Sequence, residues 1–185
     1  MKIAVVCFPD ELLITDSLLK QSQFQQGENS TELWVLGGIQ DLKTVKRLNY
    51  HKTTEILPAE AEHLKEPVCC ADAVYKCFLS HPVDLIVLPS GLRGNELAAR
   101  LSVLIGSGCM LEAAELCCVE SGVLVKKPVY AGNLQASFLF EALPLVLSLS
   151  PSPNEEIEES AKAPELARFE VKTELPEWLT EIEYE

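Results

Sequence analysis

The chain has 185 residues, of which 48% are hydrophobic, and this is enough for one folded domain with a proper core. Its formal net charge of −13 excludes the basic face that a nucleic-acid partner requires. No run of about 18 apolar residues occurs, so we expect no membrane span.

Strands and helices alternate in the first 105 residues. Strands are predicted where β-branched and apolar residues run together, and helices where apolar residues recur every three or four positions. This alternation indicates right-handed βαβ units and a Rossmann-like parallel sheet in an α/β fold. The predicted strands are 2–8, 31–36, 53–57 and 84–88, and the predicted helices are 12–25, 41–48, 68–79 and 95–105.

The pattern changes after Gly108. Four further strands follow one another with short connections, and Gly122 and Gly132 mark two of the turns. Strands that are joined by tight turns run antiparallel. We therefore expect antiparallel strands that extend one end of the parallel sheet. Their predicted ranges are 109–119, 123–129, 135–140 and 145–149.

A linker-like sequence, PSPN at 151–154, separates a domain of residues 1–153 from an acidic C-terminal arm of residues 154–185. The arm holds 11 acidic and 3 basic residues, which gives it a net charge of −8. It also carries Phe169 and Trp178, and large apolar residues are scarce in disordered tails. A solvated tail is the plainer interpretation, but we expect the arm to pack on its own domain or on a partner.

Seven cysteines, an odd number without a CxxC motif, indicate reduced thiols and a cytoplasmic location. The adjacent pairs Cys69-Cys70 and Cys117-Cys118 leave thiol redox chemistry open as a weaker possibility. Neighbours in a strand point to opposite faces, however, so Cys117 and Cys118 are expected to diverge. We expect the cysteines to be small core residues and predict no metal site, since the three histidines lack a ligand spacing.

The loop that follows strand 84–88 is the candidate binding site. Ligands bind at the carboxyl ends of parallel strands, and the N-terminus of a helix favours anions. The loop has neither a GxGxxG motif nor the Lys-Ser/Thr of a P-loop. Two alternatives are open for each arginine. Arg93 is expected either to contact a phosphate or carboxylate or to be an ordinary surface residue. Arg100 is expected either to pair with an acid across an interface or to extend its charged group from an apolar helix face into solvent. The candidate nucleotide or partner contacts are Ser90, Gly91, Arg93, Gly94, Asn95 and Arg100.

No set of residues in the chain has the pattern of a catalytic site. Ser90 is not part of a GxSxG motif, and His81 precedes a proline at the end of a predicted helix. The single carboxylates have no visible partner in the sequence. We therefore predict that the chain is not an enzyme and has no catalytic residues.

Two motifs occur in the order and separation of a known family. One is the loop and helix in LPSGLRGNELAARLSVLIGSG, and the other is the hairpin in GVLVKKPVYAGN. Over about residues 84–151 the chain resembles the N-terminal domain of the electron transfer flavoprotein α subunit. The resemblance implies a Rossmann-like fold of the adenine nucleotide alpha hydrolase type. The matching positions are Gly94, Leu97, Ala98, Arg100 and Leu101 in the helix, and Pro128, Tyr130, Ala131, Gly132 and Asn133 in the hairpin motif.

The chain departs from the family pattern in three places. Lys127 stands where the family has an arginine before the hairpin proline, and the arginine of the last strand is absent around Leu149. The third departure is that no segment resembles the flavin-binding motifs, and the similarity stops near where the FAD domain of the family begins. The family binds FAD and AMP, the AMP in its β subunit, so we expect this chain to bind no cofactor.

Two functions remain open at this point. The first is a docking or scaffold half for a β-like electron transfer flavoprotein subunit, or a chain that associates with itself. The second is a stand-alone module that binds an adenine nucleotide. Whether the chain is a truncated piece or a natural short homologue bears on the first function.

Overall fold

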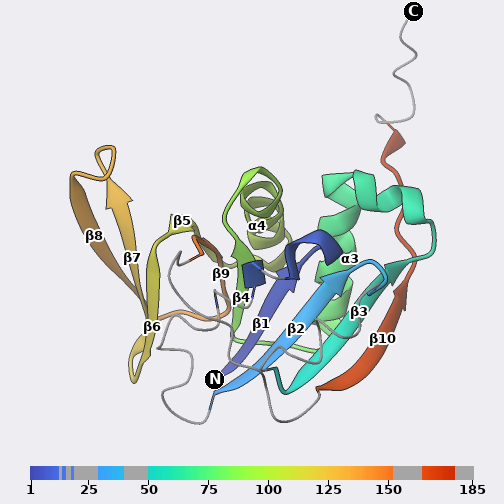
Figure 1. The fold of residues 1–185 in the computed structure, drawn as a ribbon, viewed down its shortest axis with the longest axis horizontal. Helices are drawn as coiled ribbons and strands as arrows, with labels where there is room; N and C mark the ends of the chain where they lie inside the picture. The colour runs from blue at the N-terminus through green and yellow to red at the C-terminus, as the bar shows by residue number, and fades with distance from the viewer. Residues whose placement is uncertain (13, 16–17, 19–28, 40–49, 152–163, 178–185) are drawn as a thin grey trace, which may run out of the picture.

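The computed structural model describes residues 1–12, 14–15, 18, 29–39, 50–151 and 164–177 (Figure 1). The helices are η1 (Pro9–Glu11), η2 (Ala61–Lys65), α3 (Pro67–Ser80) and α4 (Leu92–Ile105). The strands are β1 (Lys2–Cys7), β2 (Ser30–Leu36), β3 (Lys52–Pro58), β4 (Leu85–Pro89), β5 (Gly108–Ala113), β6 (Glu115–Val119), β7 (Gly122–Val129), β8 (Leu134–Phe140), β9 (Leu145–Leu149) and β10 (Glu165–Val171).

Seven strands form the main sheet in the order β10-β3-β2-β1-β4-β9-β5, and every neighbouring pair is parallel. This confirms the predicted α/β fold with a Rossmann-like parallel sheet. The remaining strands form a separate antiparallel sheet, β6-β7-β8, at one end of the molecule (Figure 1).

The prediction that the antiparallel strands extend the main sheet is wrong. Both β9 and β5 enter that sheet in parallel, and the antiparallel strands pair only with one another. All five residues of β9 are buried, as expected for an inner strand covered on both faces. The predicted strand 109–119 is in fact two strands, because the chain leaves the main sheet at Ala114.

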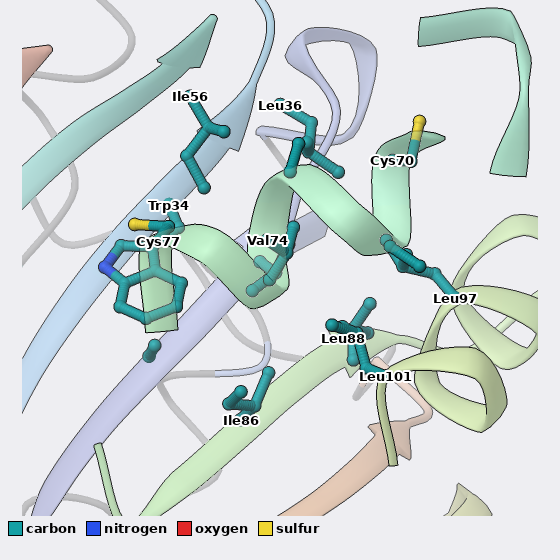
Figure 2. Packing of buried hydrophobic residues seen from close by; sticks show 14 of the residues in the cluster. Trp34, Leu36, Ile56, Cys70, Val74, Cys77, Ile86, Leu88, Leu97 and Leu101 are labelled. Atoms are coloured by element: carbon teal, nitrogen blue, oxygen red, sulfur yellow. The ribbon is translucent and has the colours of Figure 1, made fainter. Parts of the chain in front are cut away.

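Each face of the main sheet has its own hydrophobic core, because side chains alternate along a strand. In β1, Ala4 and Val6 point to one face, while Ile3, Val5 and Cys7 point to the other. Helices α3 and α4 cover the first face, and Figure 2 shows their apolar side chains packed over the strands. The small sheet covers part of the second face. Its side chains in that core are Leu116, Val123 and Val125.

Several predicted elements lie partly or wholly outside the described residues. Of the predicted helix 12–25, Leu12 and Leu18 are described and lie buried in the second core. The predicted helix 41–48 and the arm residue Trp178 fall outside the description. Helix α4 begins at Leu92, three residues before the predicted start at Asn95.

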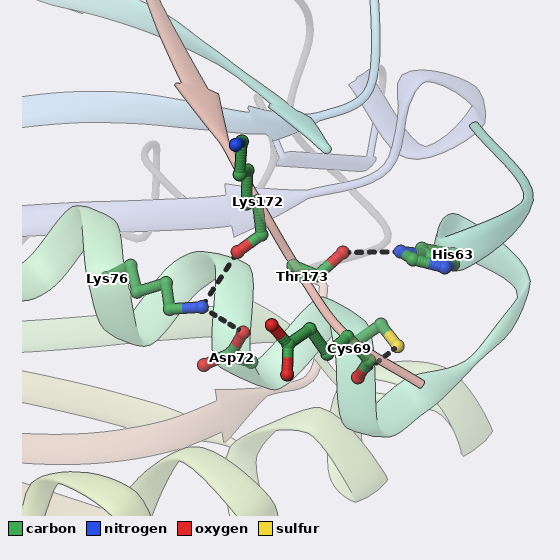
Figure 3. Close-up of polar contacts among 7 residues, drawn as sticks. His63, Cys69, Asp72, Lys76, Lys172 and Thr173 are labelled. Atoms are coloured by element: carbon green, nitrogen blue, oxygen red, sulfur yellow. Dashed lines mark hydrogen bonds and ion pairs between the residues drawn. The ribbon is translucent and has the colours of Figure 1, made fainter. Parts of the chain in front are cut away.

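The described part of the acidic arm packs on its own domain. Strand β10 pairs with β3 along seven residues and forms one edge of the main sheet. Beyond the strand, Thr173 Oγ1 shares a hydrogen bond of 2.7 Å with the buried His63 Nδ1 (Figure 3). Lys76 Nζ donates to the Lys172 carbonyl oxygen at 2.7 Å. These two hydrogen bonds attach the segment that follows β10 to η2 and to α3.

We predict that deleting residues 154–185 destabilises the domain. The deletion exposes the edge of β3 and the core contacts of Phe169 and Val171, and burial of a large apolar side chain contributes about 1.5–3 kcal/mol. The free energy of unfolding in urea should fall by roughly 2–5 kcal/mol, allowing for partial burial and for residual burial in the unfolded chain. Deletion of residues 178–185 alone keeps β10 and serves as the control. An unchanged urea midpoint for the longer deletion would contradict the prediction.

Candidate functional site

The crevice for a ligand in an open parallel sheet lies where the strand order reverses. Here the order runs from β3 through β2 to β1 and then continues with β4, so the reversal lies between β1 and β4. The segment after β1 is η1, and the segment after β4 is the short connection into α4. The predicted contacts Ser90, Gly91 and Arg93 therefore lie at the expected place.

The start of α4 is shaped by packing. Arg93, Gly94 and Asn95 lie in the first turn of the helix, where a loop was predicted. A Cβ on Gly94 would stand 1.8 Å from the Pro89 carbonyl oxygen, so glycine lets the helix approach the end of β4. The Ser90 N–H is already used, because it donates to the Leu149 carbonyl oxygen at 2.8 Å.

The side chain of Arg93 contacts the segment that follows β1. Its guanidinium lies 2.6 Å from Asp10 Oδ2 and 3.2 Å from Glu11 Oε1, and its Cζ stands 4.6 Å above the centre of the Phe8 ring. Glu11 also caps η1, because its Oε2 accepts the Phe8 N–H at 3.1 Å. The hydrogen bond from Arg93 lowers the pKa of Asp10. Asp10 is thus an ionised partner of Arg93 at neutral pH.

This arrangement does not fit the phosphate of an adenine nucleotide. In the described part of the crevice, the basic side chain that could receive a phosphate is Arg93, and two carboxylates already occupy it. The same carboxylates lie beside the first turn of α4, whose positive end would otherwise favour an anion. The crevice has the strand order of a nucleotide site, but its arginine is paired with two acidic residues of the same chain.

Asn95 takes part in a polar network that sequence reasoning missed. Ser148 Oγ donates to Asn95 Oδ1 at 2.5 Å and accepts the Glu112 N–H at 2.8 Å. Asn95 Nδ2 donates to Glu112 Oε1 at 3.1 Å. The network joins α4, β9 and β5, and it holds Glu112 at φ +57° beside a register shift in β5. The signal for it was Ser148, the single polar residue in the apolar run of β9.

The remaining predicted residues lie apart from the crevice. Arg100 pairs with Glu96 one turn earlier on α4, at 2.9 Å, so its partner is local. The hairpin motif forms the turn between β7 and β8, at the tip of the small sheet and away from β1 and β4 (Figure 1). Tyr130 and Ala131 adopt positive φ there, and Asn133 Nδ2 donates to the Tyr130 carbonyl oxygen at 3.0 Å. Pro128 lies in β7, opposite Gln135 of β8, and Gly132 has a φ of +86°.

The thiols show no reactive arrangement. Burial raises the pKa of Cys70 and of Cys77 to about 12, and it also raises the pKa of Cys7. These groups are protonated at neutral pH and are poor nucleophiles. The neighbours Cys69 and Cys70 direct their sulfur atoms to different carbonyl oxygens. Among the described residues no cluster of three or more potential metal ligands occurs, and no helix is long and apolar enough to span a membrane.

Replacing three glycines by alanine should separate two causes of strain. Gly94→Ala is expected to lower stability by roughly 3 kcal/mol or more, because its Cβ overlaps the backbone of β4. Gly132→Ala should cost about 1 kcal/mol, since its surroundings are open and only its positive φ is unfavourable. Gly38→Ala meets neither problem and is the control. Urea unfolding measures all three, and equal losses at Gly94 and Gly132 would contradict this account.

A family model described as "Electron transfer flavoprotein domain" matches residues 25–174, which are 150 of the 185 residues. The match includes α3, α4, the β7–β8 hairpin and β10. No curated protein matches the chain. The matched range covers most of the parallel sheet and the whole antiparallel sheet, and the chain belongs to the electron transfer flavoprotein domain family.

Proposed function

We propose that the chain is an α-subunit-like half of an electron transfer flavoprotein that lacks flavin binding and serves as a scaffold for a β-like subunit. In this role it catalyses no reaction and binds neither FAD nor AMP. The observation that carries the proposal is the contact of Arg93 with Asp10 and Glu11. Because of this contact, the positive charge of Arg93 in the crevice between β1 and β4 is already paired with acidic residues of the same chain.

Electrostatic magnitudes support this interpretation. Two unit charges 4 Å apart interact by about 4 kcal/mol at the effective dielectric constant of a protein surface. A phosphate beside Arg93 would gain one attraction and meet repulsion from two carboxylates, which lie 2.6 and 3.2 Å from the same guanidinium. An exposed ion pair contributes only about 0–1 kcal/mol to folding, so the acids matter here mainly through what they repel.

The alternative function is a stand-alone adenine-nucleotide-binding module. The strand-order reversal between β1 and β4 favours it, since sheets of this kind bind ligands at that point. We prefer the scaffold role because the strand order gives only the position of a crevice, whereas its side chains decide what binds there. In this chain the arginine of the crevice is paired with two acids. The free, largely buried cysteines support a reducing, cytoplasmic location for this scaffold.

The first test is ligand binding by the purified chain. We expect a colourless protein without flavin absorbance, and no rise in melting temperature with millimolar AMP. The double variant Asp10→Asn/Glu11→Gln frees Arg93 and should gain a small AMP-dependent rise, whereas the triple variant that adds Arg93→Ala should not. A wild-type chain that is yellow or is stabilised by AMP would contradict the proposal, and the AMP result would favour the nucleotide-binding module.

The second test is docking on a β-type electron transfer flavoprotein subunit from the same source. Co-elution of the two chains in size-exclusion chromatography, without added nucleotide, is the expected result. The Arg93→Ala variant should still co-elute, because its contacts lie within the chain. Two separate peaks at micromolar concentrations would contradict the scaffold role.

A further inference from the structure

Helix α4 carries large apolar side chains on the side that faces away from the sheet. Its residues Leu97 and Leu101 point into the core over the strands (Figure 2), whereas Leu92 and Val103 lie outside that core. Leu92 is 88% exposed and Val103 is 81% exposed. The outer face of a helix that covers a sheet normally carries polar residues. The two side chains are therefore apolar and largely uncovered in the described part of the chain.

The outer residues of α4 form one stripe along the helix. Leu92, Glu96, Ala99 and Val103 follow one another at intervals of four, three and four residues, and we call these four residues the α4 stripe. Residues at such intervals lie on one side of a helix, and the same intervals form the seam between two helices of a coiled coil. The α4 stripe therefore has the spacing of a surface that packs against another helix.

The charges on this outer face balance each other. Arg100 lies beside the stripe and donates to Glu96 Oε1 from Nε at 3.1 Å and from Nη2 at 2.9 Å. Within the described residues, Glu96 Oε2 and Arg100 Nη1 have no partner and are available to a second chain. The third charged residue of α4, Arg93, is directed to Asp10 and Glu11 in the crevice. The outer face of α4 is thus neutral in a chain whose net charge is −13.

We propose that two copies of this chain associate through the α4 stripe, with the two helices antiparallel about a twofold axis. The axis passes midway between Glu96 and Ala99. A twofold axis brings the same surface of both copies together, so the contact is closed and ends at a dimer. The inference goes beyond the scaffold role and does not rest on it.

The α4 stripe is self-complementary in this arrangement. Leu92 of one copy lies opposite Val103 of the second copy, and Glu96 lies opposite Ala99, because the members of each pair lie equally far from the axis. The small side chain of Ala99 leaves room for Glu96 to reach Arg100 of the second copy, which lies only about 1.5 Å further along the helix. Opposite charges therefore meet at the centre, and an apolar pair lies at each end.

The order of residues in the stripe favours a second copy over an unrelated partner. Apolar residues at both ends and opposite charges near the centre are what a twofold contact requires, whereas an unrelated partner sets no such requirement. The start of one α4 lies beside the end of the other, where residues 101–108 carry no charge. Asp10 and Glu11 at the helix start therefore meet no acid from that end of the second helix.

The test changes the two ends of the stripe separately and then together. Leu92→Glu places a carboxylate opposite Val103, and Val103→Lys places an ammonium group opposite Leu92, in both contacts of the homodimer. Each variant should weaken dimerisation about tenfold or more, because a charge loses its water against an apolar side chain. An equimolar mixture of the two variants should restore the dimer, since the mixed dimer holds one glutamate–lysine pair and one unchanged leucine–valine pair.

A matched control separates the α4 stripe from other exposed apolar positions. Leu134→Lys, at a 58% exposed position of the β7–β8 hairpin, adds the same charge and should dimerise like the wild type. Sedimentation equilibrium measures the mass of each variant and of the mixture. Leu92 and Val103 are highly exposed within one chain, so circular dichroism should show that both variants are folded.

Three results overturn the proposal. The first is a wild-type chain that stays monomeric up to millimolar concentration, whether or not it binds a β-type subunit. The second is a dimer that both α4 variants leave intact or that the Leu134 control abolishes, since the contact then lies elsewhere. The third is a mixture of the two α4 variants that remains monomeric, because the antiparallel pairing of Leu92 with Val103 is then wrong.

Discussion

A parallel sheet needs cover on both of its faces, because its strands alternate apolar side chains to both sides and its βαβ connections place helices over them. In β1, the central strand, Ile3 to Val6 are fully buried, so neither face tolerates solvent. Helices α3 and α4 cover one face, and the small antiparallel sheet covers part of the other. The departure from a plain alternation of strands and helices after β5 thus has a structural use, since it brings apolar strands over the second core.

The presence of a crevice and the binding of a ligand have different causes in this fold. Strand-order reversal leaves a gap at the carboxyl ends of β1 and β4 in any sheet of this order. What occupies the gap depends on a few side chains, and in this chain a cation from the β4 side meets two acids from the β1 side. The start of α4 is shaped by the close approach of Gly94 to the Pro89 carbonyl group, and this packing requires no ligand. Shape and electrostatics therefore carry different information about function.

Sequence reasoning located strands 2–8, 31–36, 53–57 and 84–88 to within about two residues, because buried parallel strands appear as uninterrupted apolar runs. It could not give the direction of β9, since apolar periodicity is the same for a parallel and an antiparallel strand.

Two further features, the Arg93–Asp10 pair and strand β10, were not predicted from the sequence, each for a different reason. The Arg93–Asp10 pair spans 83 residues, and its signal was that both follow strands whose carboxyl ends meet at one edge of the sheet. Strand β10 was not recognised as a strand, because its three charged residues resemble the acidic arm around it.

Strand β10 also affects how the chain reaches its fold during synthesis. Arg168 contacts Glu55 across 113 residues of sequence, and a ribosome that adds about 5–20 residues per second needs roughly 6–23 s to make that stretch. Until then β3 forms the outer edge of the growing sheet. Its sequence, KTTEILP, contains two charges and a proline, which are the devices that discourage pairing with another nascent chain. The sequence of β3 is therefore suited to exposure at the edge of the sheet until β10 has been synthesised and covers it.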